Sequence, residues 1–333
     1  AEMGARSGVA VDLGTVNTLV HLAGQGIVLD EPSAIAVDRV SGKVVAVGLE
    51  ADQLFGRAPV DVEVVHPLRD GVISDLAAAT EMLQGFLRRA RFHKSALRPR
   101  AILCAPSCAT VIEREALVAA AAFSRRLEVR LVDEPVAAAL SAGAGEESTD
   151  GVFVLDVGGG TTEAAVVVGP RMVAYRSLRL GGNTMDEAVE TALRRGLGLR
   201  VGRKDAERLK IQLGLTGGEH ASAVVAGLDV ASGSLREIEV EAAFVSAALE
   251  RAVAAIVGSV VDLLSEIPPG LAKEVIGRGV QMAGGGALLP GLAARIEKES
   301  GVGTVVVDDP LRAVVRGASR VLEEGFGSLG KTA

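Results

Sequence analysis

Hydrophobic residues along this chain fall into short runs and longer stretches that are separated by polar turns. Short Val-rich runs, such as those at 9–13 and 153–157, are typical of buried strands, and Ala-rich stretches such as 111–123 have the length of helices. Because strand-like and helix-like segments alternate throughout, the pattern predicts an α/β protein.

The order of these segments occurs twice. In each half a strand ends in an Asp and a Gly-rich turn, and a later strand ends in an acidic pair that is followed by proline and a helix. Proline behind acidic residues is a helix-start signature, and its recurrence at Pro135 and Pro310 indicates a duplication. Asp12 and Pro135 are 123 residues apart, whereas Asp156 and Pro310 are 154 residues apart.

The two halves therefore differ mainly by insertions. The second half is longer by about 31 residues, which we assign to the polar, weakly patterned stretch 183–242. The first half has its own insertion at 31–67, where short apolar runs alternate with Gly and Asp. Two similar halves that each open with an acidic, Gly-rich turn predict a cleft in which these turns face each other.

Composition narrows the classes of function. Apolar residues make up 49% of the 333 residues, with one Tyr and no Trp, which suits helices packed closely on sheets. The net charge of −7 argues against a surface built for nucleic acid. Two cysteines and four histidines are too few and too scattered for a zinc site, and no apolar run reaches the roughly 18 residues of a membrane span.

The two Gly-rich turns have the chemistry of a phosphate site. Their glycines allow backbone N–H groups to approach an anion closely, and neighbouring Thr and Asn side chains add donors. A lone Asp at a strand end is usually a turn former or a helix cap, but Asp12 and Asp156 occupy matching positions. Because a carboxylate repels phosphate, we expect each to hold a hydrated Mg²⁺. Neither a P-loop motif nor a convincing GxGxxG fingerprint is present.

An ordered set of segments from about residue 8 to 322 resembles the MreB family of bacterial actin homologues, which includes the Mbl-like proteins. The segments are "DLGTVNTLV", "GIVLDEPSAIAV", "HPLRDGVISD", "DVGGGTTEAAVV", "LGGNTMDEAV", "LKIQLG" and "GRGVQMAGGGALLPGL". The resemblance implies a duplicated, actin-like (RNase H-like) α/β fold with two large and two small subdomains around a nucleotide cleft. The implied subdomains are IA (1–30, 68–150 and 318–333), IB (31–67), IIA (151–182 and 243–317) and IIB (183–242).

The resemblance also implies ATP and Mg²⁺ as cofactors, with a role for each matching residue. Asp12 and Asp156 would serve the metal, and Glu134 and Thr161 would be catalytic, Glu134 by orienting the water that attacks the γ-phosphate. From the helix dipole alone, Glu134 is equally a first-turn carboxylate. The expected nucleotide-binding residues are Gly14, Thr15, Val16, Asn17, Gly158, Gly159, Gly160, Thr161, Gly182, Glu207, Lys210, Gly284, Gly285, Gly286, Ala287 and Leu288.

Two of these assignments depend on the resemblance most strongly. Glu207 and Lys210 lie three residues apart on one helix face and would by themselves be interpreted as a solvated ion pair. In the family they would flank the ribose and adenine. The glycines at 284–286 would by themselves be a tight strand–helix turn, and in the family they open a helix under the nucleotide.

The function that the resemblance implies is a cytoskeletal one. The chain would bind ATP, hydrolyse it weakly as it polymerises, and form head-to-tail filaments, single or as paired protofilaments. In the cytoplasm, at the inner face of the cytoplasmic membrane, these would direct cell shape and cell-wall synthesis. Expected partners are further copies of the chain, the membrane surface and the cell-wall synthesis machinery, and not nucleic acid. The alternative is a sugar-kinase-type phosphotransferase of the same superfamily.

A basic segment at 88–100 is the basis of the expected membrane contact. Six of its thirteen residues are Arg or Lys, and none is acidic. The simpler interpretation is a solvated loop. The functional interpretation is that it lies on anionic lipid with Phe92 and Leu97 dipping into the interface, mainly through electrostatic attraction.

Overall fold

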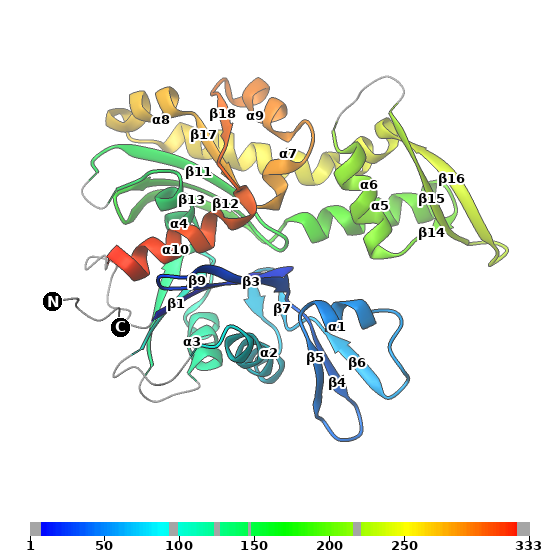
Figure 1. Cartoon of the computed structure of the whole chain (residues 1–333). Helices are drawn as coiled ribbons and strands as arrows, with labels where there is room; N and C mark the ends of the chain where they lie inside the picture. The colour runs from blue at the N-terminus through cyan, green and yellow to red at the C-terminus, as the bar shows by residue number, and fades with distance from the viewer. Residues whose placement is uncertain (1–7, 93–98, 123–126, 146–147, 216–220, 325–333) are drawn as a thin grey trace. The chain divides into compact units, whose positions relative to one another are not determined.

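The computed structural model describes residues 8–92, 99–122, 127–145, 148–215 and 221–324 (Figure 1). The chain divides into two compact units. Unit 1 comprises Ala1–Gly151, Val167–Val173 and Leu311–Ala333, and unit 2 comprises Val152–Val166 and Ala174–Pro310. Each unit combines sheets with helices, which confirms the predicted α/β class.

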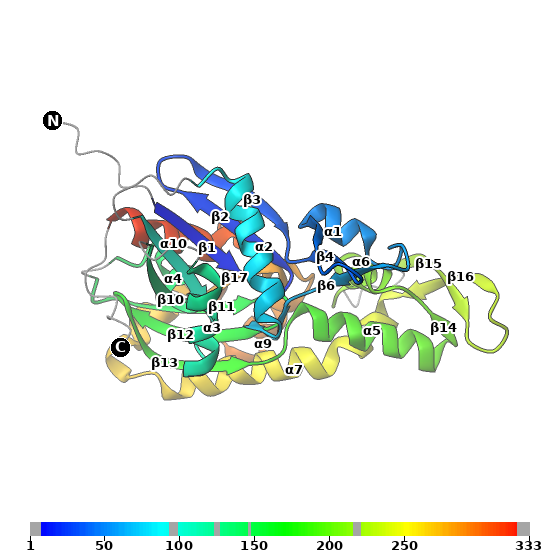
Figure 2. The ribbon, with the colours of Figure 1, turned by 90° about the horizontal axis from the view of Figure 1, so that it is seen from below.

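The large sheet of unit 1 has the strand order β10-β9-β1-β2-β3. Strands β1, β2 and β3 are antiparallel neighbours, and β9 and β10 continue parallel to β1. Helices α2 and α3 cover one face and α4 and α10 the other (Figures 1 and 2). The bounds are β1 Gly8–Leu13, β2 Asn17–Leu22, β3 Gly26–Pro32, β9 Arg100–Ala105, β10 Glu128–Asp133, α2 Leu76–Arg89, α3 Val111–Ala121, α4 Glu134–Ser141 and α10 Ala313–Glu324.

Alternation along β1 explains this layering. Val9, Val11 and Leu13 are buried together with Leu83 and Phe86 of α2, because every second side chain of a strand points to the same face. A small sheet of order β5-β4-β6 lies within the predicted insertion 31–67. The remaining elements of this unit are β4 Ile35–Asp38, β5 Val44–Val47, α1 Leu49–Leu54, β6 Val62–Val65, β7 Leu68–Arg69 and β8 Val72–Ile73.

The second large sheet has the order β13-β12-β11-β17-β18, and the strand pairs β11–β17 and β17–β18 are parallel. In the same direction the first sheet runs β3-β2-β1-β9-β10, so the strand order itself shows the predicted duplication. Helix α7 shares the core of unit 2 with β11, and it packs against α5 and α9. The bounds are β11 Gly151–Val157, β12 Thr162–Val168, β13 Arg171–Leu178, α5 Gly182–Gly196, α7 Ala242–Glu266, η1 Pro269–Leu271, α8 Ala272–Arg278, β17 Val280–Ala283, η2 Gly285–Leu288, α9 Leu292–Ser300, β18 Thr304–Val306 and η3 Pro310–Arg312.

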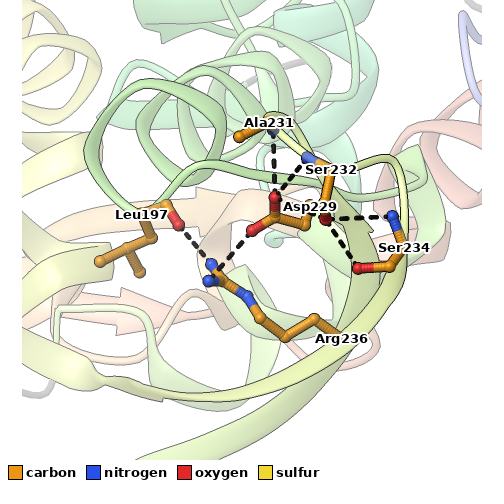
Figure 3. Close-up of polar contacts among 6 residues, drawn as sticks. All are labelled: Leu197, Asp229, Ala231, Ser232, Ser234 and Arg236. Atoms are coloured by element: carbon orange, nitrogen blue, oxygen red, sulfur yellow. Dashed lines mark hydrogen bonds and ion pairs between the residues drawn. The ribbon is translucent and has the colours of Figure 1, made fainter.

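A small sheet of order β14-β15-β16 lies within the predicted insertion 183–242, beside α6. Its outer turn is organised by Asp229, which accepts hydrogen bonds from Ser232 and the backbone of Ala231 (Figure 3). Arg236 forms an ion pair with Asp229 at 3.1 Å and donates to the carbonyl of Leu197 at 2.6 Å. These bonds connect the hairpin to the end of α5. The bounds are β14 Leu199–Arg200, α6 Arg203–Leu213, β15 Ser222–Asp229 and β16 Leu235–Glu241.

The end of the chain is divided between the two units, within the range 243–317 that we assigned to subdomain IIA. Residues 311–317 belong to unit 1, because α10 packs along α4. The two backbones are so close that a Cβ on Gly317 would lie 1.7 Å from the carbonyl oxygen of Ala137. The division into four subdomains remains a prediction.

Helix α7 also departs from the expectation that no segment could span a membrane. Among the described helices it alone is long and apolar enough by length and composition. Its buried side chains, including Val245, Leu249 and Ile256, belong to the core of unit 2. The apolar composition of α7 is therefore explained by packing inside this unit.

Candidate functional site

The first Gly-rich turn, residues 14–17 (the first loop), joins β1 to β2 as a tight hairpin. Asp12 pairs with Leu19 in the antiparallel register, and the N–H of Gly14 donates to the carbonyl of Asn17 at 3.1 Å. A Cβ on Gly14 would lie 2.7 Å from that carbonyl oxygen, so only glycine fits this close approach. The expected phosphate loop is therefore a hairpin turn, with Val16 and Asn17 exposed.

Ser33, at the end of the "DEPS" segment, supports this loop from beneath. Its hydroxyl donates to the carbonyl of Gly14 at 2.6 Å and contacts the hydroxyl of Thr18 at 2.8 Å. Its backbone N–H donates to the carbonyl of Val16 at 2.8 Å. Ser33 and Thr18 are both fully buried, so the two hydroxyl groups that support the first loop are shielded from water.

Asp30, in the same segment, connects the loop to Arg312, the last residue of η3, directly before α10. It accepts a hydrogen bond from the side-chain amide of Asn17 at 3.3 Å and forms an ion pair with Arg312 at 3.2 Å. Burial, and secondly the charge of Asp30, raise the pKa of Asp12 to about 7. This concentration of negative charge at the end of β1 suits a bound cation.

Two further candidates of unit 1 are held by their own elements. The hydroxyl of Thr15 accepts a hydrogen bond from the backbone N–H of Gly71 at 2.8 Å. Glu134 is the first residue of α4 and is partly buried, with Pro135 behind it as predicted. The preceding Asp133 forms an ion pair with Arg114 of α3, which anchors the start of α4.

The second Gly-rich turn, residues 158–161 (the second loop), repeats the geometry of the first. It joins β11 to β12, and the N–H of Gly158 donates to the carbonyl of Thr161 at 2.9 Å. Asp156 and Thr161 are buried, each with 6% of its surface exposed. The hydroxyl of Thr162 donates to the carbonyl of Leu180 at 2.8 Å, which ties the loop to the segment before α5.

The beginning of α5 lies directly on the second loop. The N–H of Gly182 donates to the carbonyl of Gly158 at 2.9 Å, and that of Asn183 donates to Gly159 at 2.8 Å. A Cβ on Gly181 would lie 2.5 Å from the carbonyl oxygen of Gly158. The predicted candidate Gly182 therefore belongs to the same local structure as the second loop.

The glycines at 284–286 pack on the end of β11. A Cβ on Gly284, whose φ is +75°, would lie 2.4 Å from a carboxylate oxygen of Asp156, and one on Gly286 would lie 2.2 Å from Val157. The segment continues as the short 3-10 helix η2, and α9 begins only at Leu292. The glycines therefore begin a short 3-10 helix, and its place beneath a nucleotide remains a prediction.

Helix α6 brings Glu207 and Lys210 to this region of unit 2. The ammonium of Lys210 donates to the carbonyl of Gly182 at 3.3 Å and lies 2.7 Å from Asp186 of α5. At the end of α6, a Cβ on Gly214 would lie 2.8 Å from the ring of Pro290, which follows η2. Unit 2 thus gathers the second loop, Gly182, Lys210 and residues 284–288.

The donors suit a nucleotide phosphate, and the carboxylates suit Mg²⁺. Among the described residues, the backbone N–H groups of Val16, Gly159 and Gly160 form no hydrogen bond, so they can donate to an anion. In the described ranges, no group of three or more His, Cys, Asp or Glu side chains is arranged so that it could hold a metal ion. A magnesium ion at Asp12 or Asp156 would therefore depend on water and phosphate oxygens for its other ligands.

Some side chains of the basic segment 88–100 are bound within the protein, which its composition did not indicate. Arg89 is held by two hydrogen bonds to Glu31, and Arg100 donates to the carbonyl of Leu322 at 3.1 Å. Phe92 is partly buried against the core of unit 1. Leu97 lies outside the described residues. Among the described basic side chains of this segment, Arg88 and Arg91 therefore remain the candidates for the predicted lipid contact.

Several residues that organise the two loops were missed by sequence reasoning. Ser33 and Asp30 belong to a segment that was noted only for its family resemblance, and Asp186 lies one helical turn after Gly182. Their positions in the sequence could have indicated this role. Ser33 and Asp30 are polar residues at the end of a strand, and Asp186 is a carboxylate on the mostly apolar helix face that also buries Met185 and Val189.

The duplicated sheets, each with an acidic strand end and a glycine hairpin, define an actin-like protein. Solved structures agree: MreB5 of Spiroplasma citri bound to ADP is 30% identical, with a TM-score of 0.89 over 97% of this chain and 99% of that one. A MamK double helical filament has a TM-score of 0.81 over 96% of this chain and 99% of that one, at 24% identity, which supports the fold alone.

The chain belongs to the MreB/Mbl family, whose model matches residues 6–327. The cell shape-determining protein MreB of Escherichia coli is 39% identical over 323 residues, covering 95% of this chain and 93% of the relative. The cell shape-determining protein Mbl of Bacillus subtilis is 37% identical over 317 residues, covering 95% of each. The resemblance drawn from the sequence is confirmed, and the sugar-kinase alternative is not favoured.

Proposed function

We propose that this protein binds ATP together with Mg²⁺ and polymerises head-to-tail into filaments that direct cell shape and cell-wall synthesis. The observation that carries the proposal is the pair of matching hairpin loops, each of which follows a strand-end carboxylate. Structures of MreB5 were solved with ADP and with AMPPNP, which supports an adenine nucleotide as ligand. Both curated relatives are named for cell shape.

The residues of this chain would divide the chemistry as follows. The N–H groups of the two loops would bind phosphate oxygens, and Asp12 and Asp156 would hold the hydrated metal. Mg²⁺, when bound, would neutralise phosphate charge. Glu134, at the first turn of α4, would orient the attacking water, with Thr161, the last residue of the second loop, as the other catalytic candidate. Hydrolysis would be weak and coupled to polymerisation.

Assembly would use further copies of the chain as partners. A head-to-tail contact joins two different surfaces, and when the repeat does not close into a ring it produces an open filament. The MamK double helical filament is a precedent for such a polymer in this fold. The filament would lie at the inner face of the cytoplasmic membrane and recruit the cell-wall synthesis machinery.

Sedimentation tests the proposal directly. The purified chain is centrifuged with ATP and Mg²⁺, with ADP, and without nucleotide, and the pellets are examined by electron microscopy. We expect filaments with ATP and Mg²⁺. The same protein is incubated with ATP and a panel of sugars, and phosphorylated sugar is measured. Absence of nucleotide-dependent filaments together with a phosphorylated sugar would overturn the proposal in favour of the phosphotransferase.

A further inference from the structure

A buried ion pair joins the two helices of the nucleotide region in unit 2. The ammonium of Lys210, on α6, lies 2.7 Å from a carboxylate oxygen of Asp186, on α5. Their side chains are 11% and 3% exposed, respectively, so the pair is shielded from water. The other ion pairs described in unit 2 are formed by side chains that are more exposed, such as Arg295 and Glu250 at 34% and 51%.

The pair is connected to the second loop through the first residues of α5. The same ammonium donates to the carbonyl of Gly182 at 3.3 Å, and the N–H of Gly182 donates to the carbonyl of Gly158 at 2.9 Å. The peptide group after Gly182 therefore binds Lys210, and the peptide group before it binds the second loop. A continuous polar path runs from Asp186 through Lys210 to the candidate phosphate loop.

Stability alone does not account for this carboxylate. Burial raises the pKa of Asp186 to about 6, although the charge of Lys210 opposes the shift. Keeping the group ionised at neutral pH therefore costs folding free energy, because the unfolded chain ionises it more readily. A buried ion pair is in general weak evidence for stability, and its better-attested use is to select one arrangement of elements.

We propose that Asp186 is a positioning residue for nucleotide binding: it holds the Lys210 ammonium against the start of α5, so that α6 and the second loop keep one arrangement. The proposal rests on the proposed function, in which the loop would bind phosphate, and on the family resemblance, by which Glu207 and Lys210 of α6 would flank the ribose and adenine. Asp186 itself would contact no part of the nucleotide. It acts through Lys210 and couples the two ends of the nucleotide-binding surface within unit 2.

The first test is equilibrium binding of ATP and ADP, with Mg²⁺, to the wild-type chain and to Asp186→Asn. We expect the variant to bind each nucleotide roughly tenfold more weakly, a typical coupling between two parts of a binding site. Glu250→Gln, which breaks an exposed ion pair of the same unit, is the matched control and should bind like wild type. Thermal unfolding of all three proteins verifies that they are folded.

The pH dependence is a readout that a purely structural role would not move. The charged groups that act on Asp186 are Lys210, Arg203 and Glu207, all on α6. As the pH falls through about 6 the carboxylate takes up a proton and releases Lys210. The ratio of wild-type to Asp186→Asn affinity should therefore be constant above about pH 7 and approach one below about pH 5. Titration of the nucleotide phosphates cancels in this ratio.

A double-mutant cycle then asks whether Asp186 acts through Lys210. We expect Asp186→Asn combined with Lys210→Met to lose no more affinity than Lys210→Met alone. Additive losses, a pH-independent ratio, or an Asp186→Asn protein with wild-type affinity would each overturn the proposal. If wild type binds neither ATP nor ADP, the proposed function itself fails, which is a separate outcome.

A measurement on wild type covers the case in which Asp186→Asn does not fold. Amide hydrogen exchange is followed with and without ATP and Mg²⁺. Because the ion pair joins them, Gly182, Asn183 and residues 203–213 should gain protection together when nucleotide binds. Protection of the second loop and the start of α5 without any change in α6 would refute the coupling.

Discussion

Ser33→Ala offers a quantitative test of how the first loop is built. Ser33 is fully buried, and its hydroxyl has one proton, which it gives to the carbonyl of Gly14 at 2.6 Å. The hydroxyl of Thr18, 2.8 Å away, must therefore donate to Ser33. Removing the Ser33 hydroxyl leaves the Thr18 hydroxyl without its acceptor, and this hydroxyl is also fully buried. It also removes one donor from the carbonyl of Gly14.

The magnitude follows from these two losses. A buried polar group left without a partner costs about 1–3 kcal/mol, and Gly14 is partly exposed, so water can replace part of its lost bond. We expect Ser33→Ala to lower the free energy of unfolding by about 2–3 kcal/mol. For a cooperative unit of roughly 150–250 residues this lowers the melting temperature by about 4–12 °C.

Calorimetry of wild type, Ser33→Ala, Thr18→Val and the double variant measures the effect. Because Thr18→Val removes the stranded hydroxyl, the double variant should be more stable than Ser33→Ala alone. Ser74→Ala, which removes an exposed hydroxyl bonded to the carbonyl of Pro67, is the control and should cost less than about 1 kcal/mol. A Ser33→Ala loss no larger than this control, or strictly additive losses, would refute the reasoning.

Three further predictions concern the proposed function. Glu134→Ala should slow phosphate release by about 10²-fold with nearly unchanged ATP affinity, measured by phosphate release and equilibrium binding; a collapse of affinity would make the residue structural. Asp156→Asn should weaken ATP binding more with Mg²⁺ than without, and an equal loss would limit this carboxylate to shaping its turn. Replacing Arg88 and Arg91 by Ser should reduce co-sedimentation of polymer with anionic vesicles at low salt more than Arg89→Ser does, since Arg89 is already paired; equal losses, or binding to neutral lipid, would contradict the membrane contact.

The parts of the fold that could be predicted are those in which local sequence determines local structure. The turns at Gly14 and Gly158 are marked by glycine directly after a buried strand, and Pro135 marks the start of α4 in the same way. The duplication was readable because the same local signals occur twice in the same order. For these features, neighbours in the sequence are also neighbours in space.

The contacts that could not be predicted join residues far apart in sequence. Arg89 was assigned to a solvated, lipid-facing segment because its neighbours are basic, but Glu31, 58 residues earlier, holds it inside unit 1. The ion pair of Asp186 with Lys210 likewise depends on how α5 packs on α6. The point at which the chain passes from unit 2 to unit 1, between Pro310 and Leu311, likewise depends on a contact between distant residues, the close approach of Gly317 to α4.

The two loops share the hydrogen bond that closes each hairpin, but different groups hold the loops in place. This difference predicts different responses to mutation. In unit 1 the loop rests on side chains, chiefly Ser33 and Asp30 of the "DEPS" segment. In unit 2 it rests on the backbone N–H groups of Gly182 and Asn183 at the start of α5, a helix with no side-chain cap. Those N–H groups would otherwise lack partners, so one set of bonds serves both the helix and the loop. The first loop should therefore respond to changes of hydroxyl and carboxylate side chains, whereas the second should respond to any side chain added at Gly181.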